Sequence, residues 1–404
     1  MPPGRPGDYF ESRPVATFSA FAPLRTALLW TLTLGLLLPV ARAQLSTEDH
    51  LQDPGFWPTQ PAASRSGYTG PEACRQCHAE KFASQAETAM RRTMLRPSAS
   101  QALHEHPRLT FEVGPYRYLI ESDAQHSLYT VTDGKQKLSS PLLWAFGTPR
   151  VGQSYLFKRA DGHFYEARVT YFARLKALGF TPARDLLHPK DVEQAMDRQV
   201  PPGEVKKCFS CHATAAVIGD QLDEQHLMPG VTCEACHGPG AKHVAEMKAL
   251  MKGDLGAAQQ DDIFDPASLM PNDYVDFCGA CHNTWWDVKL TGVTGPSTTR
   301  SAPYRLVMSK CWGKTGDPRL VCTACHDPHV PLQTDEASYD HACLRCHNTA
   351  SGTALTKEHP GKACPVSTKS CASCHMPKVY VKEMHDYFTD HRIRIARAGE
   401  PFPQ

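Results

Sequence analysis

The chain has 404 residues, and its 43 lysines and arginines nearly balance its 42 aspartates and glutamates, which leaves a formal net charge of +1. A chain without a basic excess excludes the positively charged surface of a nucleic-acid-binding protein, so we expect no nucleic-acid partner. The length allows two or three domains, and the 16 cysteines require a specific chemistry.

Residues 1–43 have the pattern of an export signal. Three arginines precede an apolar run over residues 27–40, and Ala41-Arg42-Ala43 is a small-x-small cleavage site. The apolar run is short for a membrane-spanning helix. We therefore expect a secretory signal peptide and no integral membrane span after its cleavage, with an uncleaved anchor as the alternative. The mature protein is then expected in the periplasm or otherwise outside the cytoplasm.

Residues 44–107 are predicted to form an N-terminal arm followed by a first haem unit. That unit introduces the pattern Cys-x-x-Cys-His, to which haem c is covalently attached. Two cysteines three positions apart share one side of a helical turn and can form thioethers to one porphyrin, and the histidine then ligates the iron. The pattern occurs seven times, at Cys74, Cys77 and His78; Cys208, Cys211 and His212; Cys233, Cys236 and His237; Cys278, Cys281 and His282; Cys322, Cys325 and His326; Cys343, Cys346 and His347; and Cys371, Cys374 and His375.

A single Cys-x-x-Cys pair is also compatible with a zinc site or a redox-active dithiol. Zinc sites do not require a histidine directly after each pair, and a dithiol motif occurs once. The seven repeats therefore predict about seven covalently attached c-type haems, numbered here as motifs 1 to 7 in chain order.

The stretch after motif 1 has helix-forming composition over residues 79–96 and contains Met90 and Met94, but no histidine. Either methionine could be an axial ligand of a haem iron. The alternative, which we favour, is that both pack against a porphyrin, because methionine fills irregular apolar gaps.

Residues 108–200 contain no cysteine and predict a small antiparallel β-rich insert. Runs rich in β-branched and aromatic residues are separated by turn signals, as is typical of hairpins. The predicted strands are 109–113, 116–120, 128–132, 155–158 and 164–171, with turns at Gly114-Pro115, Asp133-Gly134 and Ala160-Asp161-Gly162. We expect a structural lid over the haems or a binding module.

Residues 201–404 are predicted to form a six-haem domain. Six motifs follow one another so closely that side chains alone cannot build a normal core, so the porphyrins must supply most of the apolar interior. We expect a mainly α, loop-rich multihaem cytochrome c fold organised around about seven haems, with the β insert between the first haem and the rest.

Each motif provides one iron ligand, and 13 further histidines are available for the opposite side of the iron. Histidines that cluster beside the motifs are the best candidates. We expect His243, His329 and His391 first, followed by His385, His359, His341 and His226.

Two cysteines, Cys311 and Cys364, lie outside the motifs. In an oxidising compartment a disulfide between them is the simplest expectation. The alternative is a thiolate ligand to one haem iron, which would lower that haem's potential or create a catalytic centre.

The sequence resembles the multihaem cytochromes c related to cytochrome c-554, in a superfamily with pentahaem nitrite reductase and octahaem hydroxylamine oxidoreductase. The resemblance rests on Tyr68 to Cys74, Gly230 to Gly240, Cys325 to His329 and Cys374 to Lys378. It implies electron transfer through stacked haem pairs, with His243, His329 and His391 as distal ligands. Relatives often carry a histidine on the helix after the first motif, where this chain has methionines, and the Cys-x-x-Cys-Lys motif of the nitrite reductases is absent.

The sequence therefore predicts an extracytoplasmic cytochrome that passes electrons along its haems between redox partner proteins, rather than an enzyme. The alternative is a multihaem oxidoreductase acting on a small inorganic nitrogen or sulfur compound at an iron with an open, Cys or Met sixth site. No catalytic residue is identified from the sequence.

Overall fold

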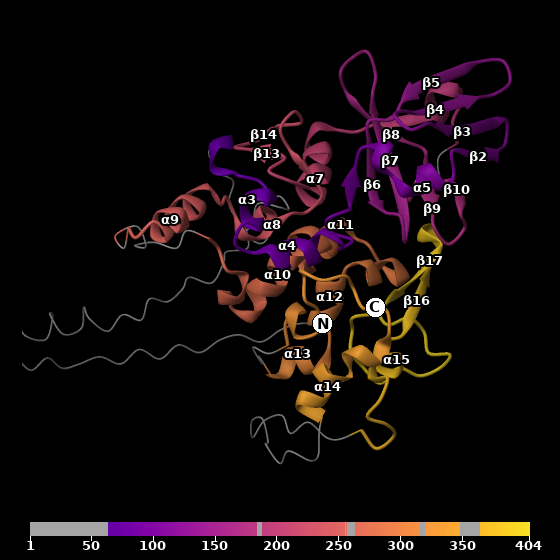
Figure 1. Cartoon of the computed structure of the whole chain (residues 1–404). Coiled ribbons are helices and arrows are strands. Elements are labelled where there is room, and N and C mark those ends of the chain that lie inside the picture. Colours follow the sequence, from indigo (N-terminus) through magenta and orange to yellow (C-terminus); the bar gives the residue numbers. More distant parts are fainter. Residues whose placement is uncertain (1–63, 184–187, 255, 257–262, 316–319, 348–363) are drawn as a thin grey trace, which may run out of the picture. The chain divides into compact units, whose positions relative to one another are not determined.

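The computed structural model describes residues 64–183, 188–254, 256, 263–315, 320–347 and 364–404, all of which belong to one compact unit (Figure 1). The predicted signal peptide lies outside these residues. Within the described ranges, no helix combines the length and the apolar character needed to cross a bilayer.

A four-stranded antiparallel sheet contains the first predicted hairpins, in the order β2-β3-β4-β5. Its strands are β2 (Arg108–Val113), β3 (Tyr116–Ser122), β4 (Ser127–Thr132) and β5 (Lys137–Pro141). The hairpin turn at Asp133-Gly134 forms as predicted: Gly134 has φ 86°, and the Asp133 carboxylate accepts the backbone N–H groups of Lys135 and Gln136.

A seven-stranded antiparallel sheet follows, with the path β1-β6-β7-β8-β11 and with β9 pairing both β7 and β10. Its strands are β1 (Met94–Leu95), β6 (Trp144–Thr148), β7 (Gly152–Lys158), β8 (Phe164–Ala167), β9 (Val169–Phe172), β10 (Ala177–Phe180) and β11 (Asp197–Gln199). The run 164–171, predicted as one strand, is divided at Arg168. The backbone N–H of this buried residue donates to the carbonyl of Met196 at 3.2 Å instead of to a neighbouring strand.

The expectation of a mainly α fold is wrong. The described residues form five antiparallel sheets, including the two above and three two-stranded ones. The latter pair β12 (Ala213–Thr214) with β15 (Met228–Pro229), β13 (Val217–Ile218) with β14 (Gln221–Leu222), and β16 (Lys378–Val381) with β17 (Asp386–Thr389). Most of the strands lie in the two larger sheets over residues 94–199, and further short strands form at 213–229 and 378–389, where the sequence favoured loops.

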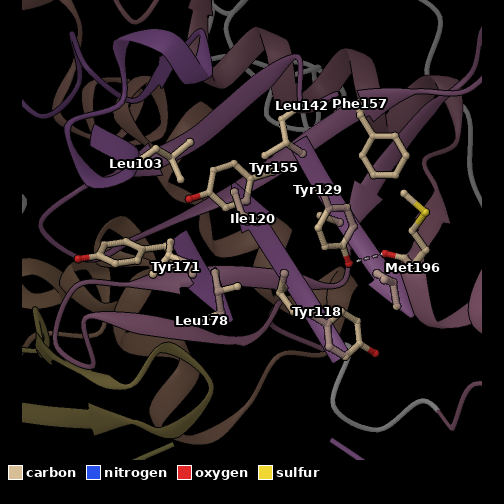
Figure 2. Close-up of a cluster of buried hydrophobic side chains, with 14 of the residues drawn as sticks. Leu103, Tyr118, Ile120, Tyr129, Leu142, Tyr155, Phe157, Tyr171, Leu178 and Met196 are labelled. Carbon is tan, nitrogen blue, oxygen red and sulfur yellow. Dashed lines mark hydrogen bonds between the residues drawn. The ribbon is translucent and has the colours of Figure 1, made fainter. Parts of the chain in front are cut away.

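Several buried tyrosines lie in the interior of the large sheets, among aliphatic side chains such as Leu103 and Ile120 (Figure 2). Tyr118, Tyr129 and Tyr155 have no exposed surface. The Tyr129 hydroxyl donates to the carbonyl of Met196 at 2.8 Å, which ties helix α6 (Val192–Met196) to strand β4. Alternation of inward and outward side chains along β3 contributes to this core, because successive residues of a strand point to opposite faces, whereas three successive residues of β4, 129–131, are buried.

A second apolar cluster joins β6 to helix α7 (Pro202–His212), where Trp144 and Phe146 pack edge-on against Phe209. The two clusters of buried apolar side chains found among the described residues draw all their buried members from residues 94–227.

The helices are short, as the spacing of the motifs requires. Before the sheets are η1 (Arg65–Gly67), α3 (Pro71–Arg75), α4 (Ala79–Ala86), η2 (Pro97–Ala99) and α5 (Gln101–Glu105). After α7 come α8 (Cys233–His237), α9 (Ala241–Met251), η3 (Pro266–Ser268), α10 (Pro271–His282), α11 (Trp285–Thr291), η4 (Gly295–Arg300), α12 (Ala302–Val307), α13 (Lys310–Thr315), η5 (Cys322–Ala324), η6 (Glu336–Tyr339), α14 (Asp340–His347), α15 (Cys371–His375) and η8 (Lys382–Met384). The helical composition over 79–96 yields a helix only to Ala86.

Candidate haem-binding site

A cavity of ≈ 3610 Å³ runs through the part of the chain that carries the motifs. At least one cysteine and the histidine of all seven motifs line it, and only Cys208 and Cys374 among the motif cysteines do not. Sites for single small ligands measure about 300–1,000 Å³, so this space suits several large groups rather than one. Apolar side chains of α9, including Val244, Met247 and Met251, also line it, and no residue of that helix is buried.

Cysteines of different motifs lie beside one another in this cavity. Four contacts between thiols connect motifs 1 and 3, 2 and 4, 4 and 5, and 6 and 7. The pairs are Cys74 with Cys233, Cys211 with Cys281, Cys278 with Cys322, and Cys343 with Cys371. Burial raises the pKa of Cys236 to about 12, so this thiol is neutral at physiological pH. Attachment points of neighbouring motifs therefore adjoin one another.

Several motif histidines are neutral because the protein buries them. Burial lowers the pKa of His212 to about 4, and it also lowers the pKa values of His282 and His326. The pKa of His391, outside the motifs, falls to about 4 for the same reason. Neutral imidazole is the form that ligates a metal.

Hydrogen bonds of three histidines determine which ring nitrogen can ligate iron. The Nδ1–H of His237 donates to the carbonyl of Phe264 at 2.9 Å, and that of His375 donates to the carbonyl of Arg394 at 2.8 Å. His391 donates in the same way to the carbonyl of Thr389 at 3.0 Å. A backbone carbonyl only accepts, so each ring carries its proton on Nδ1 and leaves the Nε2 lone pair free for iron.

Two histidines from outside the motifs face motif histidines. The rings of His329 and motif-3 His237 are nearly parallel, with 15° between their planes and 6.0 Å between their centroids. The centroids of His391 and motif-5 His326 are 6.2 Å apart. Two metal–nitrogen bonds of about 2.0–2.1 Å each would hold the coordinating nitrogens about 4 Å apart. The ring centroids lie further out than the nitrogens, so both separations fit one iron between each pair.

The remaining predicted distal ligands fall into three groups. His243 on α9 and His341 on α14 line the cavity, and the Nδ1–H of His341 donates to the carbonyl of Ser338 at 2.8 Å. His226 is exposed and pairs with Asp223 at 2.8 Å, and His385 packs against the ring of Phe172 in β9, so neither lines the cavity. His359 lies outside the described residues.

The methionines and the extra cysteines occupy different settings. Met94 is buried in the second apolar cluster, whereas Met90 lines the cavity. Cys311 and Cys364 also line it, and the disulfide expected between them stays a prediction.

A zinc interpretation of the Cys-x-x-Cys pairs requires four clustered ligands. Among the residues that the structure describes, no three His, Cys, Asp or Glu side chains gather as such a site demands. The donor set instead supplies thiols on helical turns and single imidazoles, which is what covalent haem attachment uses.

Comparison with known proteins agrees with this chemistry. Residues 180–238, which contain motifs 2 and 3, match the family described as cytochrome c554 and c-prime. Over 195 residues the chain is 27% identical to the C-type polyheme cytochrome OmcB of Geobacter sulfurreducens, which covers 42% of this chain and 24% of OmcB. Over 222 residues it is 24% identical to the multiheme cytochrome MtrA of Shewanella baltica, which covers 47% of this chain and 60% of MtrA.

The chain is a multihaem c-type cytochrome. Its match spans about a quarter of the length of OmcB and three fifths of that of MtrA. The solved structure of the outer cell wall cytochrome OcwA aligns with 81% of this cytochrome and 80% of its own chain, at 14% identity and a TM-score of 0.45. The cofactor of this cytochrome is covalently bound haem c.

Two carboxylates that join motifs of the cytochrome escaped the sequence analysis. Glu234, between the cysteines of motif 3, accepts the backbone N–H groups of Thr69, Gly70 and Gly240 at 2.8–2.9 Å. Asp340, at the start of the motif-6 helix, accepts the N–H groups of Ser370 and Cys371 at 2.7 Å each. Each carboxylate thus holds the beginning of another motif's helix, α3 or α15. The sequence showed that both positions are acidic, but it did not show that their carboxylates bind the backbone of another motif.

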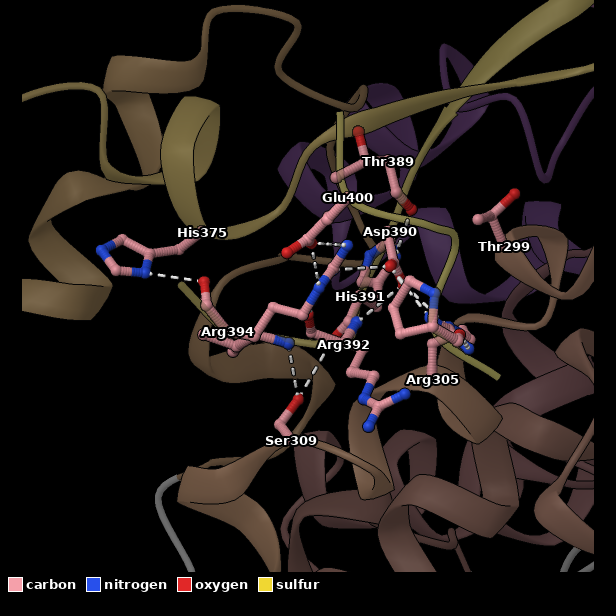
Figure 3. Close-up of polar contacts among 12 residues, drawn as sticks. Thr299, Arg305, Ser309, His375, Thr389, Asp390, His391, Arg392, Arg394 and Glu400 are labelled. Carbon is pink, nitrogen blue, oxygen red and sulfur yellow. Dashed lines mark hydrogen bonds and ion pairs between the residues drawn. The ribbon is translucent and has the colours of Figure 1, made fainter. Parts of the chain in front are cut away.

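A buried ion-pair network fixes the C-terminal segment of the cytochrome (Figure 3). The Arg305 guanidinium donates to both oxygens of Asp390 at 2.8 and 2.9 Å, and Arg394 donates to the same carboxylate at 2.8 Å. Arg305 and Asp390 have no exposed surface. The network holds the backbone next to His391, and the backbone N–H of Arg394 donates to the carbonyl of His375. Arg392 and Arg394 of this segment therefore make contacts within the chain, Arg392 with the carbonyl of Gln404 and Arg394 with Asp390.

Proposed function

We propose that this cytochrome carries electrons along seven covalently attached haems, one at each motif. The observation that carries the proposal is the pairing of His329 with His237 and of His391 with His326 inside a cavity that all seven motifs line. Imidazoles on both sides of an iron leave no position for a substrate, which favours electron transfer over catalysis at these two sites.

The motif cysteines and the histidines have different roles in haem binding. The fourteen motif cysteines would hold the cofactors and the seven motif histidines would ligate the irons, with His329 and His391 as further ligands at motifs 3 and 5. When bound, haem c supplies a one-electron ferric–ferrous couple. The protein fixes each ring through the Nδ1 hydrogen bonds of His237, His375 and His391.

The adjoining cysteines support a route between haems. Motif 4 adjoins both motif 2 and motif 5 through its two cysteines, so attached groups there would have neighbours on two sides. We propose that electrons enter and leave at haems near the surface and pass to redox partner proteins outside the cytoplasm. The predicted export signal and the extracytoplasmic character of haem c attachment support that location.

Haem stoichiometry and spin state test the proposal. We expect the purified protein from a host able to attach haem c to have a mass seven haems above that of the polypeptide. Its low-temperature EPR spectrum should be low-spin, and His329→Ala and His391→Ala should each create one high-spin haem. A bare polypeptide mass would overturn the assignment, and a high-spin signal in the unaltered protein that shifts with nitrite or sulfite would favour an enzyme.

A further inference from the structure

The Asp327 carboxylate accepts a hydrogen bond from Nδ1 of His329. Its Oδ1 accepts from Nδ1 of His329 at 2.9 Å and from the backbone N–H of the same residue at 2.9 Å. Its Oδ2 accepts from Nζ of Lys81, on helix α4 directly after motif 1, at 3.3 Å. The carboxylate therefore lies between a cation and the imidazole that faces His237.

This acceptor differs from those of the comparable histidines. His237, His375 and His391 all donate their Nδ1–H to neutral backbone carbonyls. A carboxylate acceptor draws the Nδ1 proton more strongly and makes the imidazole a better electron donor to a metal at Nε2. Stronger donation stabilises ferric iron more than ferrous iron, and axial and outer hydrogen bonding are established ways of tuning haem potential.

We propose that Asp327 is a positioning and tuning residue that lowers the reduction potential of the haem between His237 and His329, and that Lys81 opposes this effect. The inference rests on the proposed function, since it requires an iron between these two rings. With Asp327 as acceptor, this haem should have a lower reduction potential than with a neutral backbone carbonyl. The contact between Lys81 of α4 and Asp327, next to motif 5, should modulate that potential.

The direct hydrogen bond, rather than distant charge, is the expected cause. The Asp327 side chain is 44% exposed and the His329 side chain 34% exposed, so solvent screens their through-space electrostatic effects. A carboxylate elsewhere on the surface should therefore have little influence. Asp335 provides that comparison, because it caps η6 through the N–H of Ala337, and its contacts within the described part of the chain include no histidine.

The test is a spectroelectrochemical titration of the holoprotein with Asp327→Asn, Lys81→Gln and the matched control Asp335→Asn. In Asp327→Asn we expect the midpoint potential of one haem to move positive by about 59 mV, which corresponds to a tenfold change in its one-electron equilibrium constant of reduction. In Lys81→Gln the midpoint potential of the same haem should move negative. The EPR g-values of one low-spin haem should change in both variants and remain unaltered in Asp335→Asn.

Equal shifts in Asp327→Asn and Asp335→Asn would overturn the inference. If Asp327→Asn fails to retain its haems, Lys81→Gln decides alone: a negative shift supports the proposed role, and no shift or a positive shift overturns it. His329→Ala tests iron ligation by His329 separately from the role of Asp327. A new high-spin haem in that variant, together with unshifted potentials in the others, would leave the proposed function standing and reject the role of Asp327.

Discussion

Glu234 of motif 3 accepts the backbone N–H of Gly70, the residue directly before the helix of motif 1, at 2.8 Å. These residues are 164 positions apart in the chain. The same carboxylate also binds Thr69 and Gly240, and its side chain is 3% exposed. A charged acceptor at this depth is stable because three N–H donors replace its water.

Glu234→Gln should therefore destabilise the start of the first haem unit. An amide has one acceptor oxygen, so at least one of the three N–H groups is left buried without a partner, and we expect a loss of about 2–3 kcal/mol. Hydrogen exchange at the amides of residues 69 and 70, together with chemical denaturation, measures this effect. Glu72→Gln is the control, because Glu72 forms an exposed pair with Arg75, and it should change stability by no more than about 1 kcal/mol.

Asp340→Asn should loosen the start of motif 7. The Asp340 carboxylate holds the N–H groups of Ser370 and Cys371, and asparagine retains one acceptor for two donors. We expect a cost of about 1–2 kcal/mol and roughly tenfold faster exchange of these two amides. Asp265→Asn, at an exposed cap of η3, should leave both amides unaffected. Equal exchange rates in the two variants would contradict the assigned role.

Arg305→Met should disturb the segment that carries His391. The substitution removes a bidentate partner from a carboxylate without exposed surface and leaves only Arg394 to compensate it, at a cost of about 3 kcal/mol. The matched change Arg117→Met removes an exposed pair with Glu112 and should cost less than about 1 kcal/mol. Denaturation gives the energies, and weakening of one low-spin EPR signal reports the displacement of His391. An unchanged midpoint would show that the network does not support this segment.

Two tyrosines in the sheet core provide a matched pair. Tyr129 and Tyr118 are both fully buried, but Tyr129 donates to the Met196 carbonyl, whereas no partner for the Tyr118 hydroxyl lies among the described residues. We expect Tyr129→Phe to lose about 1 kcal/mol and Tyr118→Phe to be neutral or slightly stabilising, since it removes a buried unsatisfied hydroxyl. Thermal unfolding followed in the far-ultraviolet circular dichroism compares them. The reverse order would reject the hydrogen-bond assignment.

Local patterns in the sequence were sufficient to predict the motifs and several hairpins. Turns such as Asp133-Gly134 depend on a few adjacent residues, and these form where the sequence indicates. The mainly α expectation failed because strands pair with segments well separated in the chain, as β1 does with β6 through Met94 and Phe146. Periodicity within a single segment does not report such pairing.

The sequence also could not show which histidines lie opposite which motif histidines. Proximity in sequence to a motif suggested His226 and His385, but the fold turns His226 to the solvent and His385 onto Phe172. His329 follows motif 5 in the chain but faces His237 of motif 3. Partner choice across motifs is set by the three-dimensional path of the chain, so the sequence could name candidates without assigning them.

The location of the apolar clusters has a consequence for biogenesis. Their buried residues lie between Met94 and Leu227, so the sheets can consolidate as soon as that portion emerges after export. The later portion, with motifs 3 to 7, contributes no buried member to either cluster among the described residues, so we expect it to fold as its cofactors are attached. Maturation should therefore be sequential, and an intermediate starved of haem should keep a protease-resistant sheet half while its C-terminal half is digested.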